Sequence, residues 1–140
     1  MKQIPVIFWT GTGNTQMMAD AVAEAINAAG AEAVVKNVSE ITADEAAGYD
    51  ALALGCPAMG AEVLEECEFE PFFTELEGKL AGKKVALFGS YGWGGSYMQD
   101  WEARVKDAGA TLVADGVLAL GAPDDEAMAK LAEAGNLLAE

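Results

Sequence analysis

The sequence predicts an α/β protein in three layers, a doubly wound parallel sheet of five strands with helices on both faces. Short apolar runs alternate with longer amphipathic segments along the 140 residues, as strands and helices do in a parallel sheet. The run Ala51–Gly55 is apolar throughout, which suits a strand buried on both faces. No repeat, linker or low-complexity tract interrupts this pattern, so we expect residues 1–140 to form a single domain.

Two strands and a helix are predicted ahead of that central run. The first strand covers Val6–Trp9 and opens at Pro5, where a missing N–H does least harm. A helix over Asn14–Ala29 follows and ends at Gly30, and Ala33–Val38 forms the second strand. The inward face of the helix carries apolar residues at helical spacing: Met18, Val22, Ile26 and Ala29.

Two more helices flank the fourth strand, Val85–Gly89. Pro71 is expected at the first position of one helix, where no N–H is needed. The other helix ends at Gly109. Their inward faces are predicted from apolar residues at core spacing: Phe72, Phe73, Leu76 and Leu80 in the first helix, and Met98, Trp101 and Val105 in the second.

The last two elements complete the alternation. The fifth strand lies within Leu112–Leu120, and Asp124 or Asp125 caps the final helix. Three apolar residues are expected to point inward from this helix: Met128, Leu131 and Leu138.

Composition excludes several classes of function. The chain has 23 acidic and 8 basic residues and a net charge of −15, which repels nucleic acids and anionic membranes. No apolar stretch approaches the ~20 residues that cross a membrane, and the first strand begins too early to leave room for a signal peptide. The two cysteines, Cys56 and Cys67, suit a reducing cytoplasm. Without a histidine or a Cys-x-x-Cys pair, we expect no metal site.

Three segments rich in small and polar residues follow predicted strands. They are 10–15 after the first strand, 56–62 after the third and 89–94 after the fourth. The carboxyl ends of parallel strands share one edge of the sheet, so these segments should converge on one crevice. This convergence predicts a ligand site.

The first segment, Thr10-Gly11-Thr12-Gly13-Asn14-Thr15, predicts an anion site. Hydroxyls and free amides at a strand-to-helix turn suit an anion, although the threonines could simply cap the helix. No Lys or Arg lies between Lys2 and Lys36, so neutral dipoles must hold the anion and the lysine-containing phosphate loop is excluded. Gln16 stands where a dinucleotide fingerprint needs its third glycine.

Together the three segments resemble those of the flavodoxins, small FMN-carrying electron-transfer proteins. The flavodoxin phosphate loop, Ser/Thr-x-Thr-Gly-x-Thr, matches Thr10, Thr12, Gly13 and Thr15. With its 140 residues, the chain resembles the short-chain flavodoxins of clostridial type. The resemblance implies the strand order 2-1-3-4-5 and non-covalently bound FMN. It also implies low-potential one-electron transfer, cycling between semiquinone and hydroquinone, in an electron carrier that is not an enzyme.

The same resemblance implies roles for individual residues. Met59 and Trp93 would sandwich the flavin ring, and Glu62 would accept its N3–H. The Met59-Gly60 peptide would turn over on one-electron reduction, which glycine permits. The implied FMN-binding residues are Thr10, Gly11, Thr12, Gly13, Asn14, Thr15, Pro57, Ala58, Met59, Gly60, Glu62, Ser90, Tyr91, Gly92, Trp93 and Gly94.

Acidic residues crowd the stretch after the third predicted strand: Glu62, Glu65, Glu66, Glu68 and Glu70. They form either a docking surface for basic redox partners or a solvated face. We expect a cytoplasmic monomer with no nucleic-acid or membrane partner.

Two other readings stay open, an FMN-dependent reductase of quinones or similar small acceptors and a regulatory protein that uses the fold without FMN. A signalling receiver domain is excluded, because its acidic pair, its aspartate and its lysine are missing at the ends of the first, third and fifth strands.

Overall fold

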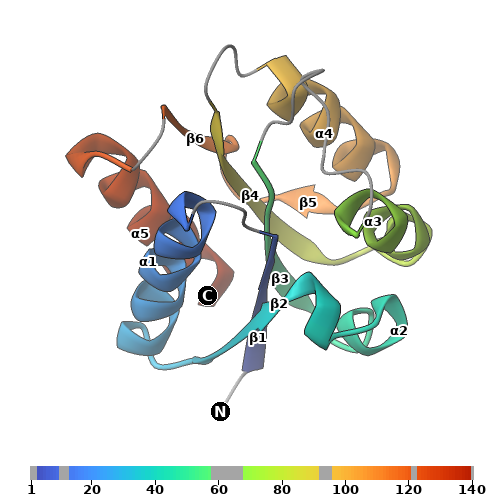
Figure 1. Cartoon of the computed structure of the whole chain (residues 1–140). Helices are drawn as coiled ribbons and strands as arrows, with labels where there is room; N and C mark the ends of the chain where they lie inside the picture. The colour runs from blue at the N-terminus through green and yellow to red at the C-terminus, as the bar shows by residue number, and fades with distance from the viewer. Residues whose placement is uncertain (1–2, 10–12, 58–67, 92–95, 121–122, 140) are drawn as a thin grey trace.

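A parallel sheet forms the centre of the molecule, with helices on both of its faces (Figure 1). The computed structural model describes residues 3–9, 13–57, 68–91, 96–120 and 123–139, with the backbone alone at Tyr91, Ser96 and Leu120. The strand order is β2-β1-β3-β4-β5, which confirms the predicted order. Strand β6 pairs with β4, as β5 does. The strands are β1 (Gln3–Phe8), β2 (Glu32–Asn37), β3 (Ala51–Gly55), β4 (Lys84–Tyr91), β5 (Thr111–Leu112) and β6 (Val117–Leu120).

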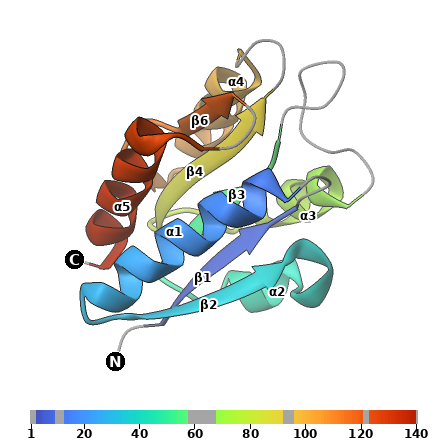
Figure 2. The same cartoon turned by 60° about the vertical axis from the view of Figure 1, so that its left-hand side comes forward.

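The helices divide between the two faces of the sheet (Figure 2). Helices α1 (Asn14–Ala28) and α5 (Asp125–Ala139) pack on one face. Helices α2 (Ala43–Ala46), α3 (Phe69–Glu77) and α4 (Ser96–Asp107) cover the other face. A short 3-10 helix, η1 (Val38–Glu40), precedes α2 in the chain. None of the helices within the described ranges has the length and apolar character that crossing a membrane requires.

Alternation along the central strand supplies different side chains to the two faces. In β3, Leu52 and Leu54 face α2, α3 and α4, whereas Ala51 and Ala53 face α1 and α5. Successive side chains of a strand point to opposite faces, so one strand serves both layers. The predicted inward residues of α3, α4 and α1 are buried with one exception, Ala29, which is exposed and follows the last residue of α1. Leu80 is buried as expected but lies beyond the end of α3 at Glu77, so it is not a residue of that helix.

The strands differ from the sequence prediction at three places. Strand β1 begins at Gln3, so Pro5 lies inside it and just before the Val6–Phe8 stretch that pairs with β3. Strand β4 extends to Tyr91 because its last residues pair with β6. The fifth predicted strand is divided into β5 and β6, and each piece pairs with a different stretch of β4.

The helices also show corrections. Helix α3 begins at Phe69, so Pro71 is its third residue, a place where the N–H has no intrahelical partner. Met128 is 40% exposed and does not belong to the inward face of α5. The end of α1 at Gly30, where φ is +95°, agrees with the prediction. Asp124 caps α5 by accepting the Ala127 N–H at 2.8 Å.

The prediction missed two short elements, η1 and α2. Each begins with a capping box in which a side chain and a backbone N–H three residues apart satisfy each other. The pairs are Asn37 with Glu40 and Thr42 with Glu45. This spacing is visible in the sequence and was the available signal.

A substitution at the contact between α1 and α5 tests how closely these helices pack. A Cβ at Gly135 would lie 2.8 Å from the Val22 carbonyl oxygen and 2.8 Å from the Ala25 Cβ. Gly135→Ala should therefore lower the free energy of unfolding by about 1–3 kcal/mol through overpacking, despite the better helix propensity of alanine. Urea unfolding followed by circular dichroism measures this.

The matched control is Gly78→Ala at the end of α3. A Cβ at Gly78 meets nothing within 4 Å among the described residues, and the backbone there is right-handed. This variant should be neutral or more stable by up to about 1 kcal/mol. Equal stabilities of the two variants would contradict the close approach of α1 and α5.

Candidate functional site

Strands β1 and β3 end in line at one edge of the sheet, and their neighbour β4 continues past them to Tyr91. Phe8 of β1 is in register with Gly55 of β3, which is in register with Phe88 of β4. The pairing continues beyond β1 and β3: the Trp9 N–H donates to the Gly55 carbonyl at 3.0 Å, and the Cys56 N–H donates to the Phe88 carbonyl at 3.1 Å. The three segments singled out in the sequence therefore leave from neighbouring points.

Helix α1 begins at this edge of the sheet. Its N-cap is Gly13, with φ +93° and ψ −9°, a left-handed conformation that suits glycine. Among the described residues no side chain caps the helix, and its first turn holds no acidic residue. The alternative in which a threonine side chain caps this helix therefore gains no support from the described residues. The positive end of the helix dipole is available to an anion.

Thr15 brings a hydroxyl to the same helix end. Its side chain is 1% exposed, and Oγ1 has no hydrogen-bond partner among the described residues. A buried hydroxyl without a partner costs about 1–3 kcal/mol, so this one fits an external acceptor. The other such atom in the described ranges, Trp101 Nε1, belongs to the core between α3 and α4 and not to this edge.

The carboxyl end of β3 is held by a hydrogen bond from α4. Tyr97 Oη donates to the Cys56 carbonyl oxygen at 2.8 Å, and both residues are buried. Burial raises the pKa of Tyr97, and the nearby Cys56 thiol raises it further, so the phenol stays protonated and remains a donor. Cys56 itself is fully buried, as structural cysteines are.

The start of α3 is fixed to two other elements. Trp9 Nε1 donates to Glu68 Oε1 at 3.3 Å, which ties α3 to the end of β1. Phe69 packs edge-on against Trp101 of α4, with ring centroids 5.5 Å apart. The expected burial of Trp101 is confirmed, whereas Trp9 is only partly buried. Residues 58–67 thus lie between two anchored ends, Cys56 and Glu68.

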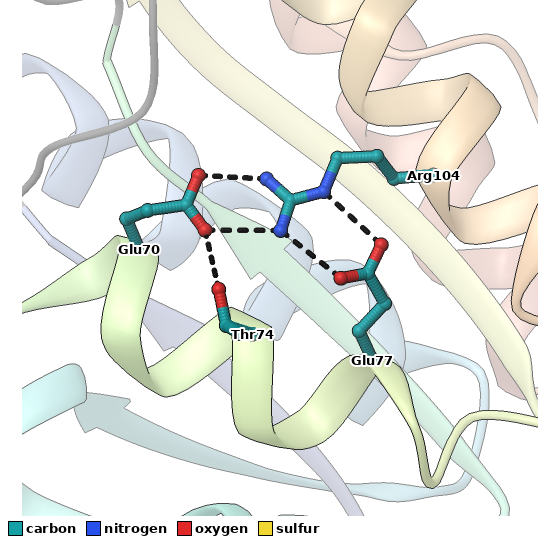
Figure 3. Close-up of polar contacts among 4 residues, drawn as sticks. All are labelled: Glu70, Thr74, Glu77 and Arg104. Atoms are coloured by element: carbon teal, nitrogen blue, oxygen red, sulfur yellow. Dashed lines mark hydrogen bonds and ion pairs between the residues drawn. The ribbon is translucent and has the colours of Figure 1, made fainter.

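Arg104 joins α3 to α4 through two carboxylates (Figure 3). It donates to both oxygens of Glu70 at 2.7 and 2.9 Å and to both oxygens of Glu77 at 3.1 Å. The guanidinium also lies 4.7 Å from the ring centroid of Phe73. Thr74 Oγ1 donates to Glu70 at 2.7 Å. Glu70 is therefore committed to this clamp, whereas Glu68 is exposed at the end of the acidic run.

The predicted site residues fall into two groups. Gly13, Asn14, Thr15, Pro57 and Ser90 lie in the described structure at this edge, together with the backbone of Tyr91. Ser90 is 7% exposed and pairs with Ala119 within the sheet, so it is a strand residue and not a loop residue. The others lie outside the described residues: Thr10, Gly11, Thr12, Ala58, Met59, Gly60, Glu62, Gly92, Trp93 and Gly94.

The sequence prediction of this site missed Tyr97 and Arg104, and it named Glu68 only as part of the acidic stretch. These three residues bond to Cys56, Glu70 and Trp9, respectively, which lie 41, 34 and 59 residues away in the sequence. No local pattern predicts contacts at such separations.

Comparison with known proteins decides the family, because the flavodoxin family profile matches residues 6–135. The chain belongs to the flavodoxin family. A flavodoxin from Clostridium beijerinckii is 48% identical over 121 residues, which are 86% of this chain and 88% of that protein. A flavodoxin from Megasphaera elsdenii is 47% identical over 116 residues, 82% of this chain and 85% of that protein.

The fold agrees with the same family. The solution structure of two-electron reduced Megasphaera elsdenii flavodoxin matches with a TM-score of 0.90 and 43% identity, over 97% of this chain and 98% of that one. As a flavodoxin, the protein carries FMN and transfers electrons to partner proteins, and it is a carrier and not an enzyme. No relative described above supports the reductase alternative.

The clamp around Arg104 predicts a pH dependence of stability. The hydrogen bonds from Arg104 hold the pKa of Glu70 below its ordinary value of 4.5. A carboxylate with a lowered folded-state pKa stabilises the protein above its unfolded-state pKa, and this contribution is lost as the pH falls through the folded-state pKa. The stability advantage of the wild type over Glu70→Gln should be constant near neutral pH and shrink below about pH 4.5.

Chemical denaturation across the acid range measures this difference. Glu126→Gln is the control, since it removes one negative charge from an exposed pair with Lys130 and reports the background effect of net charge. A wild-type advantage over Glu70→Gln that did not change with pH would contradict the ionic role of the clamp.

Proposed function

We propose that this member of the flavodoxin family binds FMN at the carboxyl edge of its sheet, with residues 1–140 acting as one domain. The phosphate would lie at the start of α1, and the ring would lie between the segments that follow β3 and β4. The observation that carries this proposal is the buried Thr15 hydroxyl, which has no partner among the described residues and lies at a helix end with no acidic residue in its first turn. The chemistry of this edge fits an anion held by neutral donors.

The chain's own residues would bind and tune the cofactor, which supplies one-electron redox chemistry when bound. The phosphate donors are the hydroxyls of Thr10, Thr12, Thr15 and Ser90 and the amides of Gly13, Asn14 and Thr15. Met59 and Trp93 would cover the two faces of the ring, bordered by Gly11, Pro57, Ala58, Tyr91, Gly92 and Gly94. Glu62 would accept the N3–H of the ring, and the carbonyl of the Met59-Gly60 peptide would be the acceptor for N5 when N5 carries a proton.

Charge supports a low working potential. The protein has a net charge of −15, and the start of α1 offers dipoles but no basic side chain to offset further negative charge. Adding an electron without a proton to a site of this kind is costly, because the low-dielectric surroundings strengthen repulsion. Glu62 adds to that cost if it lies beside the ring.

Thr15→Val tests the placement of the phosphate. Valine removes the hydroxyl that is buried without a partner, so the apoprotein should be as stable as the wild type or more stable. Binding of FMN should weaken by about 1–3 kcal/mol, because the phosphate loses a donor. Thr15→Ser keeps the hydroxyl and should retain affinity. Calorimetric titration of apoprotein with FMN and with riboflavin measures both effects, and an unchanged FMN affinity in Thr15→Val would contradict the proposal.

The acidic stretch is proposed as the docking surface for basic redox partners, and we propose that the protein works as a cytoplasmic monomer. Neither nucleic acid nor membrane suits so acidic a chain. Glu70 is excluded from the docking surface by its bond to Arg104, which leaves Glu62, Glu65, Glu66 and the exposed Glu68. Surface charges of this kind raise association rates more than affinities.

Salt should therefore slow electron transfer to a basic haem protein. In stopped-flow measurements the rate constant of the wild type should fall steeply as the ionic strength rises, since exposed charges are screened beyond about 10 Å at 0.1 M salt. Glu68→Gln should reduce this salt dependence while keeping an acceptor for Trp9. Glu126→Gln, on α5, should leave it unchanged. Equal salt dependence in all three proteins would mean that the acidic stretch is only a solvated face.

A further inference from the structure

The hydrogen bond between Tyr97 and Cys56 spans three elements in a space that admits no additional atom. Tyr97 is the second residue of α4 and 2% exposed, and Cys56 directly follows β3. The bond crosses β4 at Gly89, where a Cβ would lie 2.2 Å from Tyr97 Oη and 2.1 Å from the Cys56 carbonyl oxygen. Any side chain at position 89 would break this crossing.

The hydroxyl of Tyr97 does more than fill space in the core, because it donates a hydrogen bond. A phenylalanine at position 97 would bury the same ring without placing a hydroxyl in an apolar region, where a hydroxyl must find a partner. The partner used here is a main-chain carbonyl, so the bond fixes backbone and not a movable side chain. That carbonyl lies at the point where the chain leaves the sheet.

The two ends of this bond adjoin the two segments proposed to hold the flavin ring. Residues 57–62 begin immediately after Cys56, and residues 92–95 end just before α4, which Tyr97 opens together with Ser96. We propose that Tyr97 is a positioning residue: its bond sets the separation between the end of β3 and the start of α4, the two points that these segments adjoin, and hence the fit of the flavin ring. This inference rests on the proposed FMN site.

Tyr97→Phe tests the inference through ligand binding by folded apoprotein. Riboflavin carries the same ring as FMN and lacks the phosphate, so the two ligands separate ring contacts from phosphate contacts. Dissociation constants come from quenching of flavin fluorescence, at a temperature where circular dichroism shows each variant fully folded. Tyr97→Phe should weaken both ligands by the same factor, about tenfold, because the bond that ties the Cys56 carbonyl to α4 is lost.

Three comparison proteins make the result specific. Tyr49→Phe makes the same chemical change just before the opposite end of β3 and should leave both affinities unchanged. Thr15→Val should weaken FMN alone. Replacement of Tyr97 by 4-aminophenylalanine restores a donor on the same ring and should recover most of the affinity for both ligands.

The outcomes distinguish the positioning role from the site itself. If Thr15→Val weakens FMN while Tyr97→Phe binds both flavins as the wild type does, the positioning role is wrong and the site stands. If Thr15→Val has no effect, the proposed phosphate site fails. If Tyr97→Phe does not fold, the flavin affinities of two other proteins are compared. One carries 4-fluorophenylalanine at position 97, which fills the space of the hydroxyl without donating a hydrogen bond, and the other carries 4-aminophenylalanine there. Equal affinities of those two proteins would overturn the inference.

Discussion

The close approach of β3 and β4 at Gly55 is the constraint on which the arrangement of the site depends. A Cβ at Gly55 would lie 2.1 Å from the ring of Phe88, so that ring occupies the space that a side chain would need. Phe88 is itself buried among the residues under α1 and α5. A slip of one residue would turn every side chain of the strand to the other face. The pairing of Phe88 with Gly55 therefore fixes the register of β3 against β4 at the edge from which the three segments leave.

The two faces of the sheet are built for different tasks. Under α1 and α5, strand β3 supplies only alanines, Ala51 and Ala53, between the larger Phe8 of β1 and Phe88 of β4, and Gly135 brings the two helices together. The opposite face carries leucines and aromatic rings, and α3 and α4 are joined there by Arg104 and by the Phe69–Trp101 contact. Close packing on the first face holds the helix end at Thr15. Ionic and aromatic contacts on the second hold the elements that border the other two segments.

The sequence was sufficient for the features that depend on local pattern. Alternating runs located the strands, helical spacing identified most inward residues, and Gly30 marked the end of α1, since each of these follows from residues close together in the chain. Prediction failed where tertiary contacts decide. Met128 has the spacing of an inward residue, but its side chain lies on the exposed face of α5. Strand β4 extends to Tyr91 only because β6 pairs with it.

The same distinction explains what could be known of the site. The Thr- and Gly-rich segment, its lack of basic residues and its place at a strand-to-helix turn all lie within a few positions, so an anion site could be inferred from them. The bonds from Tyr97 to Cys56 and from Arg104 to Glu70 join residues that only the fold brings together. The isolation of the Thr15 hydroxyl is likewise a property of packing, which no sequence pattern records.

The anchoring of Cys56 and Glu68 has a consequence for how this protein can evolve. Both ends of the stretch between them are fastened by groups that lie elsewhere, namely Tyr97, Trp9 and, next to Glu68, Trp101. Because the scaffold holds both ends, the entropic cost of joining them grows only slowly with the number of residues between them. Changes in the length of this stretch would therefore act on the chain between two fixed points, without removing the contacts that hold those points.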